Sequence, residues 1–189
     1  MVLRFDRAGL NGTIPAEIGD LTFLKEIRIL SNFNFLSGTL PTEIGLLTNL
    51  EVAYFQENNE VIPTQIGLLT NLKTLRLKGE GTIPTCTEIG YLTELQKLLL
   101  IGAIGDGLNG LTGTVPAELG SLTALTRITF AGTYDSLSGG LPAEVCDLLN
   151  FNLAGISFRS GVSIDSDFVK GPFSVRSEDR SKCDMVSFD

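Results

Sequence analysis

The segment 15–29, PAEIGDLTFLKEIRI, contains a pattern of apolar residues that recurs along most of the chain. Apolar residues follow Pro15 at three, six, nine, twelve and fourteen positions, and similar series follow Pro41, Pro63 and Pro116. After Pro84 the series begins two residues later. Six of the seven prolines mark such units, at Pro15, Pro41, Pro63, Pro84, Pro116 and Pro142. The sequence is therefore read as an array of one repeated unit.

The spacing within each unit changes from three residues to two, and this change predicts the local structure. A spacing of three fits tight 3₁₀ turns, and alternation at the last two positions fits a short strand with one buried face. Since each unit buries its apolar residues only against its neighbours, several units must stack. We expect an α/β repeat fold, a right-handed solenoid with a parallel β-sheet on its concave face and 3₁₀ or short helical turns on its convex face.

The segments 36–45, LSGTLPTEIG, and 111–120, LTGTVPAELG, carry the most specific motifs. They resemble the plant-type, extracellular leucine-rich repeats of plant and eukaryotic-algal proteins and of receptor-kinase ectodomains. The resemblance extends from Leu3 to about Phe158. It implies a leucine-rich repeat solenoid, a fold that serves receptors, enzyme inhibitors and adhesion proteins alike.

The expected organisation is a solenoid of about six repeats over residues 1–158, followed by a C-terminal cap or tail over 159–189. The first repeat is truncated, because Leu3 already occupies a strand position, so we expect a fragment of a longer protein. The interval between Pro84 and Pro116 is expanded by a glycine-rich segment, 102–109. This expansion is the first place where we expect a partner to bind.

The three cysteines are Cys86, Cys146 and Cys183, too few and too widely spaced for a four-ligand zinc site. Cys146 lies on the last repeat's turn and Cys183 in the tail, so we predict a disulfide between them that attaches the tail. The alternative is two ordinary thiols in a reducing compartment. We expect Cys86 to be unpaired.

Composition excludes several classes of function. The chain contains no histidine, which removes Ser-His and Cys-His nucleophiles and histidine metal sites. Its net charge of −8 disfavours nucleic-acid binding, which needs a basic surface. No apolar stretch reaches the roughly 18 residues of a membrane span. We therefore expect a protein that is not an enzyme, with no catalytic residues, metal or cofactor and no nucleic-acid partner.

The residues that alternate with the buried strand positions are expected to face the concave surface. Six of them are basic and only two are acidic, whereas glutamates recur two residues after the prolines on the convex side. This contrast predicts an acidic or polar partner on the concave face. The predicted charge contacts are Arg28, Arg76, Lys97 and Arg127. The predicted apolar and aromatic anchors are Tyr54, Leu99 and Ile101. The alternative is that these side chains only keep the sheet soluble.

The leading functional hypothesis is a non-catalytic binding module for a protein or an acidic polysaccharide, as part of a secreted or cell-surface protein. One alternative is the ectodomain fragment of a receptor-like kinase, and another is a secreted inhibitor of a cell-wall-degrading enzyme. The expected location is extracellular or at the cell surface. A cytoplasmic location is the alternative, because the chain begins without a secretory signal sequence.

Overall fold

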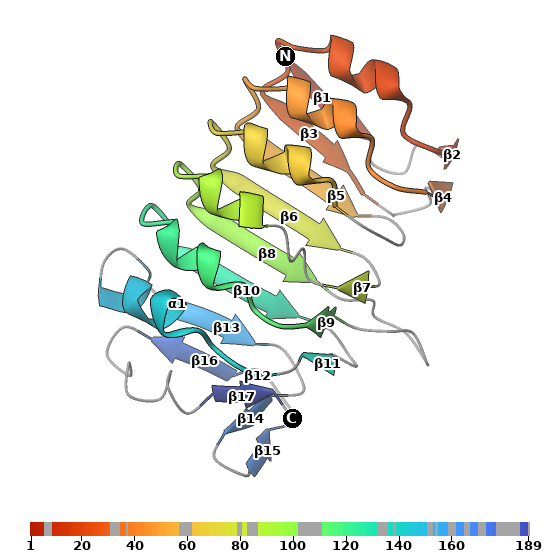
Figure 1. The fold of residues 1–189 in the computed structure, drawn as a ribbon. Helices are drawn as coiled ribbons and strands as arrows, with labels where there is room; N and C mark the ends of the chain where they lie inside the picture. Colours follow the sequence, from red (N-terminus) through yellow and green to blue (C-terminus); the bar gives the residue numbers. More distant parts are fainter. Residues whose placement is uncertain are drawn as a thin grey trace.

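The computed structural model describes most of the repeat region and parts of the C-terminal segment (Figure 1). The described residues are 1–5, 9–30, 35–36, 38–56, 62–78, 81–82, 87–101, 111–131, 136–137, 139–150, 153, 155–158, 162–164, 167–169, 173–176 and 186–188. The glycine-rich segment 102–109, Cys86 and Cys183 lie outside them.

Within the described residues, eight strands form the main sheet, in the order β1-β3-β5-β6-β8-β10-β13-β16. The first seven run parallel: β1 (Val2–Phe5), β3 (Glu26–Ile29), β5 (Val52–Gln56), β6 (Thr74–Lys78), β8 (Lys97–Ile101), β10 (Arg127–Ala131) and β13 (Gly155–Phe158). β16 (Phe173–Arg176) pairs antiparallel with β13. Each repeat therefore contributes one strand to a continuous parallel sheet.

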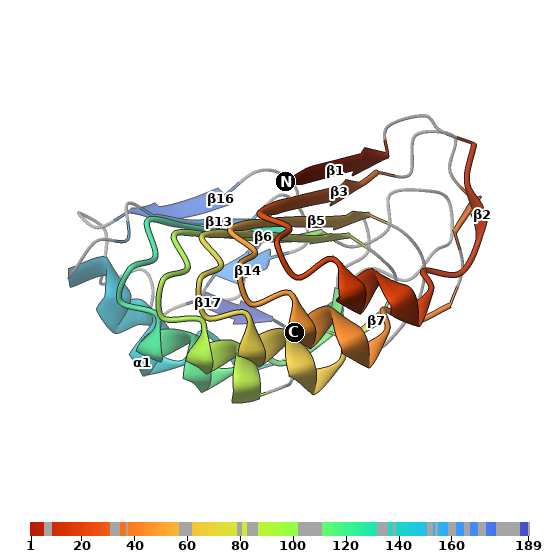
Figure 2. The same cartoon turned by 90° about the horizontal axis from the view of Figure 1, so that it is seen from above.

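A row of short helices lies on the other side of the molecule from the sheet (Figure 2). The 3₁₀ helices are η1 (Ala16–Asp20), η2 (Thr42–Leu46), η3 (Thr64–Leu68), η4 (Thr87–Tyr91) and η5 (Ala117–Ser121). The short α-helix α1 (Ala143–Asp147) follows in the same row, and η6 (Leu148–Asn150) comes directly after it. We call this surface the helix face and the outer surface of the sheet the sheet face. The predicted solenoid is confirmed.

The three-residue spacing of the sequence matches a chain of backbone hydrogen bonds. In the second repeat, the amide of Ile44 donates to Pro41, that of Leu47 to Ile44, and that of Leu50 to Leu47, at 3.1, 3.1 and 2.9 Å. Pro41 itself has φ −65° and ψ 146°, the extended geometry that suits a residue directly before a helix. Each apolar position is thus both a core residue and a link in the turn.

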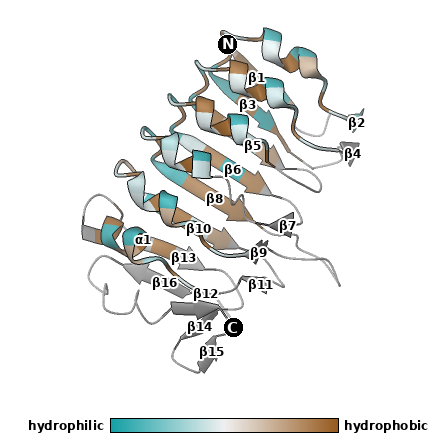
Figure 3. Cartoon of the chain, viewed as in Figure 1, coloured by the Kyte–Doolittle hydropathy of each residue, from teal (hydrophilic) through white to brown (hydrophobic). Residues whose placement is uncertain are grey.

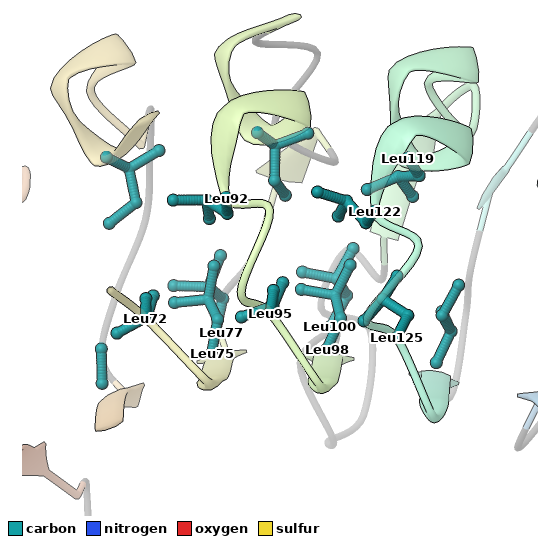
Figure 4. Packing of buried hydrophobic residues seen from close by; sticks show 14 of the residues in the cluster. Leu72, Leu75, Leu77, Leu92, Leu95, Leu98, Leu100, Leu119, Leu122 and Leu125 are labelled. Atoms are coloured by element: carbon teal, nitrogen blue, oxygen red, sulfur yellow. The ribbon is translucent and has the colours of Figure 1, made fainter. Parts of the chain in front are cut away.

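The core consists of leucine and isoleucine columns that run between the sheet and the helices (Figure 4). Leu72, Leu95 and Leu125 are at most 1% exposed, as are Leu75, Leu98 and Ile128 on the strands. Because each residue packs on its counterparts in the repeats before and after, the core is continuous along the solenoid.

Neighbouring helices approach so closely that glycine is required between them. A Cβ built on Gly67 would lie 2.6 Å from the carbonyl oxygen of Glu88, and one on Gly120 would lie 2.5 Å from the Cβ of Glu144. Equivalent short contacts occur at Gly19 and Gly45. The recurring glycine of the Glu-Ile-Gly motif therefore sets how closely the repeats stack on the helix face.

Several short strands form smaller sheets. β2 (Asn11–Gly12) pairs with β4 (Phe35–Leu36), and β9 (Leu111–Gly113) pairs with β7 (Gly81–Thr82) and β11 (Ser136–Leu137). A third sheet has the order β12-β17-β14-β15, with β12 (Gly139–Gly140), β17 (Val186–Phe188), β14 (Val162–Ile164) and β15 (Asp167–Val169). Through β16 and β17, the C-terminal segment pairs with strands of the repeat region.

The boundary between solenoid and cap and the pairing of Cys146 with Cys183 both stay predictions. β13 ends at Phe158, the predicted last residue of the solenoid. The end of one strand does not by itself establish a domain boundary. Cys146 is fully buried and disulfide-bonded, while the residue predicted as its partner, Cys183, is outside the described residues. Among the described residues, no helix is long and apolar enough to cross a membrane.

The glycine column can be tested by the substitution Gly67→Ala. The added methyl group would overlap the backbone of η4, so we expect a loss of about 1 to 3 kcal/mol in the free energy of unfolding. Thermal unfolding followed by circular dichroism measures it, with Thr64→Ala, an exposed residue of the same helix, as the control. Equal midpoints for the two variants would contradict the packing constraint.

The predicted disulfide can be tested by peptide mapping under non-reducing conditions, which should recover a fragment linking Cys146 to Cys183. The substitution Cys183→Ser should destabilise the protein by roughly 3 to 4 kcal/mol, because the closed loop restricts the unfolded chain. Cys86→Ser serves as the control and should leave the melting temperature unchanged. Recovery of a fragment linking Cys86 to Cys146 would refute the pairing.

Candidate functional site

The register of the parallel strands brings four of the predicted site residues into one row across the sheet face. Arg28 on β3, Tyr54 on β5, Arg76 on β6 and Leu99 on β8 are direct partners from strand to strand. On β1 the row continues with Arg4. We call these five residues the central row. Their side chains share one face because successive residues of a strand point to opposite sides.

The other predicted site residues lie in two neighbouring rows. Lys97 and Arg127 are register partners at the start of β8 and β10, in the row that contains Glu26 and Thr74. Ile101 lies at the other end of β8. All seven predicted side chains therefore come from five consecutive strands, but only part of the set is in direct contact.

Glu26 gathers two arginines at the start of the central row. Arg4 donates a hydrogen bond from Nε to Glu26 Oε1 at 2.7 Å, and Arg28 Nε lies 2.6 Å from the same oxygen as an ion pair. The hydrogen bond from Arg4, with the charge of Arg28 beside it, lowers the pKa of Glu26 below its ordinary value. Arg28 is therefore already neutralised in part by its own chain.

Tyr54 interacts with arginines from the strands on both sides of it. The Arg28 guanidinium carbon lies 4.4 Å from the centre of the Tyr54 ring, and that of Arg76 lies 5.9 Å away. Both distances are within the range of cation–π attraction, about 6 Å. These contacts orient two long side chains that would otherwise be free to rotate, so less conformational entropy is lost when a ligand binds to them.

Three cations of the sheet face have no acidic partner among the described residues. Arg76, Lys97 and Arg127 form no ion pair within the part of the chain that the structure describes, and Arg76 Nε is covered yet makes no hydrogen bond there. Lys97 and Arg127 are adjacent in register, so an anion placed between them would relieve their mutual repulsion. These three residues are the strongest candidates for contacts with a negatively charged ligand.

The character of the surface changes along the central row. Towards the N-terminal strands it presents arginine and tyrosine, and on β8 it presents Leu99, with Ile101 in the neighbouring row. Leu99 and Ile101 are both half-buried. Thr129, the partner of Leu99 on β10, is only 8% exposed. The face therefore offers cationic and aromatic side chains next to apolar ones, which suits a ligand with both acidic and apolar groups.

The predicted site residues do not include Arg4 and Glu26, which the structure places beside Arg28. Both lie at outward positions of their strands. The pairing of Glu26 with Arg4 joins two strands and depends on their register, whereas Arg28 is two residues from Glu26 on the same strand. The signal was available, since aligning the repeat offsets places Leu3 beside Ile27 and hence Arg4 beside Arg28.

A second charge cluster lies just before the strands. Glu51 accepts hydrogen bonds from Lys25 Nζ at 3.0 Å and from Lys73 Nζ at 2.9 Å, so it bridges three successive repeats. These bonds lower the pKa of Glu51 to about 2, with the bond from Lys73 as the largest cause. The same pair raises the pKa of Lys73. Among the described residues, no group of histidine, cysteine or carboxylate side chains could hold a metal ion.

Solved structures similar to this chain are plant receptor ectodomains, although no family model and no curated protein matches the sequence. The plant peptide hormone receptor RGFR1 in complex with RGF2 is 31% identical over 85% of this chain, with a TM-score of 0.63. The TDR receptor is 31% identical over 78%, with a TM-score of 0.59. The ectodomain of the receptor kinase GASSHO1/SCHENGEN3 from Arabidopsis thaliana, in complex with CASPARIAN STRIP INTEGRITY FACTOR 2, is 29% identical over 85%, with a TM-score of 0.55. This chain spans 25, 24 and 22% of those chains, respectively.

The stabilising contribution of Glu51 should depend on pH. Because the folded-state pKa of Glu51 is depressed, its stabilising contribution is fully present above the ordinary value of 4.5 and is lost as the pH falls towards about 2. Carbon-detected NMR of the carboxyl group should show a midpoint near 2, and Lys73→Ala should raise it. A wild-type midpoint at the ordinary value would show that the bridge does not form in solution.

Proposed function

Because this chain belongs to the plant-type leucine-rich repeat proteins, we propose that it is a non-catalytic binding module that holds an acidic peptide or protein segment on its sheet face. The observation that carries the proposal is the central row, in which Arg28 and Arg76 stack against Tyr54 and Leu99 follows on the next strand. Arginine and tyrosine are the residue types that most often dominate interface energetics.

The charge of the sheet face supports an acidic ligand. Its described side chains on β1 to β10 include five cations and one anion, a net charge of +4, although the whole chain carries −8. The cations are Arg4, Arg28, Arg76, Lys97 and Arg127, and the anion is Glu26. A positive patch on a negative protein selects acidic partners and accelerates their encounter.

The dimensions of the row suit an extended segment. Arg28 to Leu99 covers three strand spacings, or about 14 Å, which is the length of roughly four extended residues. A peptide lying across the strands could place an acidic side chain near Arg76 and an apolar one near Leu99. Lys97 and Arg127 would then contact a second acidic group beside the row.

The comparisons support a more specific version, in which the chain is part of the ectodomain of a receptor-like kinase. Two of the similar structures were solved as complexes, RGFR1 with RGF2 and GASSHO1/SCHENGEN3 with CASPARIAN STRIP INTEGRITY FACTOR 2. On this proposal the protein acts outside the cell or at its surface. The full-length coding sequence tests it: a kinase domain following a membrane span supports the receptor, and the lack of both contradicts it.

The ligand proposal is tested by selecting peptides from a displayed random library against this chain. We expect the selected peptides to be enriched in Asp and Glu, and Arg76→Glu to weaken their binding by about tenfold or more, equivalent to about 1.4 kcal/mol. Fluorescence anisotropy with a labelled peptide measures the affinity. Oligogalacturonide tested in parallel covers the acidic polysaccharide alternative.

The control must match the charge change without altering the sheet face. The double variant Thr64→Glu, Thr87→Glu also shifts the net charge by −2, but on two exposed helix-face positions. If Arg76→Glu and this control weaken binding equally, the ligand does not contact the central row. Arg28→Glu is a poor test, because it would place a second carboxylate against Glu26.

A further inference from the structure

The helix face carries a line of apolar side chains that the proposed function does not use. Leu46, Leu68 and Tyr91 are the last residues of η2, η3 and η4, and they are 56, 55 and 61% exposed. The same helix position is polar on either side of them, with Asp20 on η1 and Ser121 on η5. We call these three residues the apolar row. In Figure 3, the row of short helices shows apolar turns beside hydrophilic ones.

The apolar row runs beside a line of acidic side chains. The second residue of each helix is Glu17, Glu43, Gln65, Glu88 or Glu118, followed by Glu144 on α1. Side chains three residues apart in a 3₁₀ helix eclipse one another, so Glu43 lies on the same side of its helix as Leu46, and Glu88 on the same side as Tyr91.

These glutamates have no cationic partner within the described part of the chain. Glu43 and Glu88 accept hydrogen bonds from the threonine hydroxyls directly before them, at 3.1 and 3.3 Å, which leaves their charge uncompensated. An exposed apolar strip bordered by unpaired negative charge marks an interaction surface. The uncompensated glutamates favour a partner that carries basic groups.

We propose that this surface binds an amphipathic α-helix of a partner protein, with apolar residues along one ridge and lysine or arginine on the side that faces the glutamates. The geometry fits, because stacked repeats are about 4.8 Å apart at the sheet, and a helix advances about 5.4 Å per turn. A ridge of positions i, i+3 or i+4, and i+7 would therefore meet one apolar residue of each successive repeat.

The close stacking of the turns makes the row a continuous surface. Leu46 Cδ1 lies 3.0 Å from the position of a Cβ on Gly19, and Leu68 Cδ1 lies 3.0 Å from that on Gly45. Each leucine thus rests on the glycine of the preceding turn. The apolar row is one residue wide, so it suits a helix that binds along it better than a partner with a broad, flat surface.

The test uses a synthetic peptide of about 16 residues, roughly 24 Å long as a helix, with leucines on one ridge and lysines beside them. Its control contains the same residues with the leucines distributed around the helix. Fluorescence anisotropy should show binding of the ridged peptide that weakens with salt. The triple variant Leu46→Ser, Leu68→Ser, Tyr91→Ser should weaken that binding by about tenfold or more.

Two further variants separate the contributions of the apolar row and of the glutamates to peptide binding. Phe23→Ser removes an aromatic side chain that is 81% exposed but lies outside the apolar row, and it should leave the affinity unchanged. Replacing Glu43, Glu88 and Glu118 by glutamine should reduce the salt dependence. Thermal unfolding verifies that each variant is folded.

Three results would overturn the proposal. The first is equal affinity of the chain for the ridged and the control peptide, and the second is unchanged affinity in the triple variant. The third is self-association in sedimentation velocity that the triple variant abolishes, which would make a second copy of the chain the occupant. None of these results would affect the sheet-face proposal, because it concerns a different surface. Arg76→Glu, the variant that tests the sheet face, should not alter binding of a cationic peptide to the helix face.

Discussion

The close approach of successive turns on the helix face constrains the rest of the structure. Glu88 of one turn comes so near to Gly67 of the turn before it that no side chain fits between them. On the opposite side, the parallel strands hold the same repeats at hydrogen-bonding distance. With both sides fixed, the leucine columns between them form one continuous core, and the residues that remain outside line up in rows.

These rows explain how a protein built from one repeated unit can carry two different surfaces. A substitution at one outward position leaves the core unchanged, so each row is free to vary in chemistry. On the sheet face, three arginines and a tyrosine share the central row, with Lys97 and Arg127 beside it. On the helix face, glutamates border three exposed apolar residues. The net charge of −8 does not reveal this separation of charge, because it is the sum over both surfaces.

The internal contacts of the sheet face determine which residues are available to a ligand. Glu26 holds Arg4 and Arg28, and Tyr54 stacks with Arg28 at closer range than with Arg76. Arg28 thus positions the aromatic ring and is less suited to bind an external anion. Arg76, Lys97 and Arg127 have no acidic partner among the described residues and keep their charge for a ligand.

The sequence by itself determined the repeat, the 3₁₀ turns, the parallel strands and the buried positions, because each follows from a spacing of apolar residues that is local to one unit. Alternation also placed Arg28, Tyr54, Arg76 and Leu99 on the outer surface of the sheet. The sequence did not reveal that Glu26 lies between two arginines, or that Leu46, Leu68 and Tyr91 form one line. Arg4 and Glu26 are 22 positions apart, and successive members of the apolar row are more than 20 apart, so only the stacking register of the folded repeats brings them together.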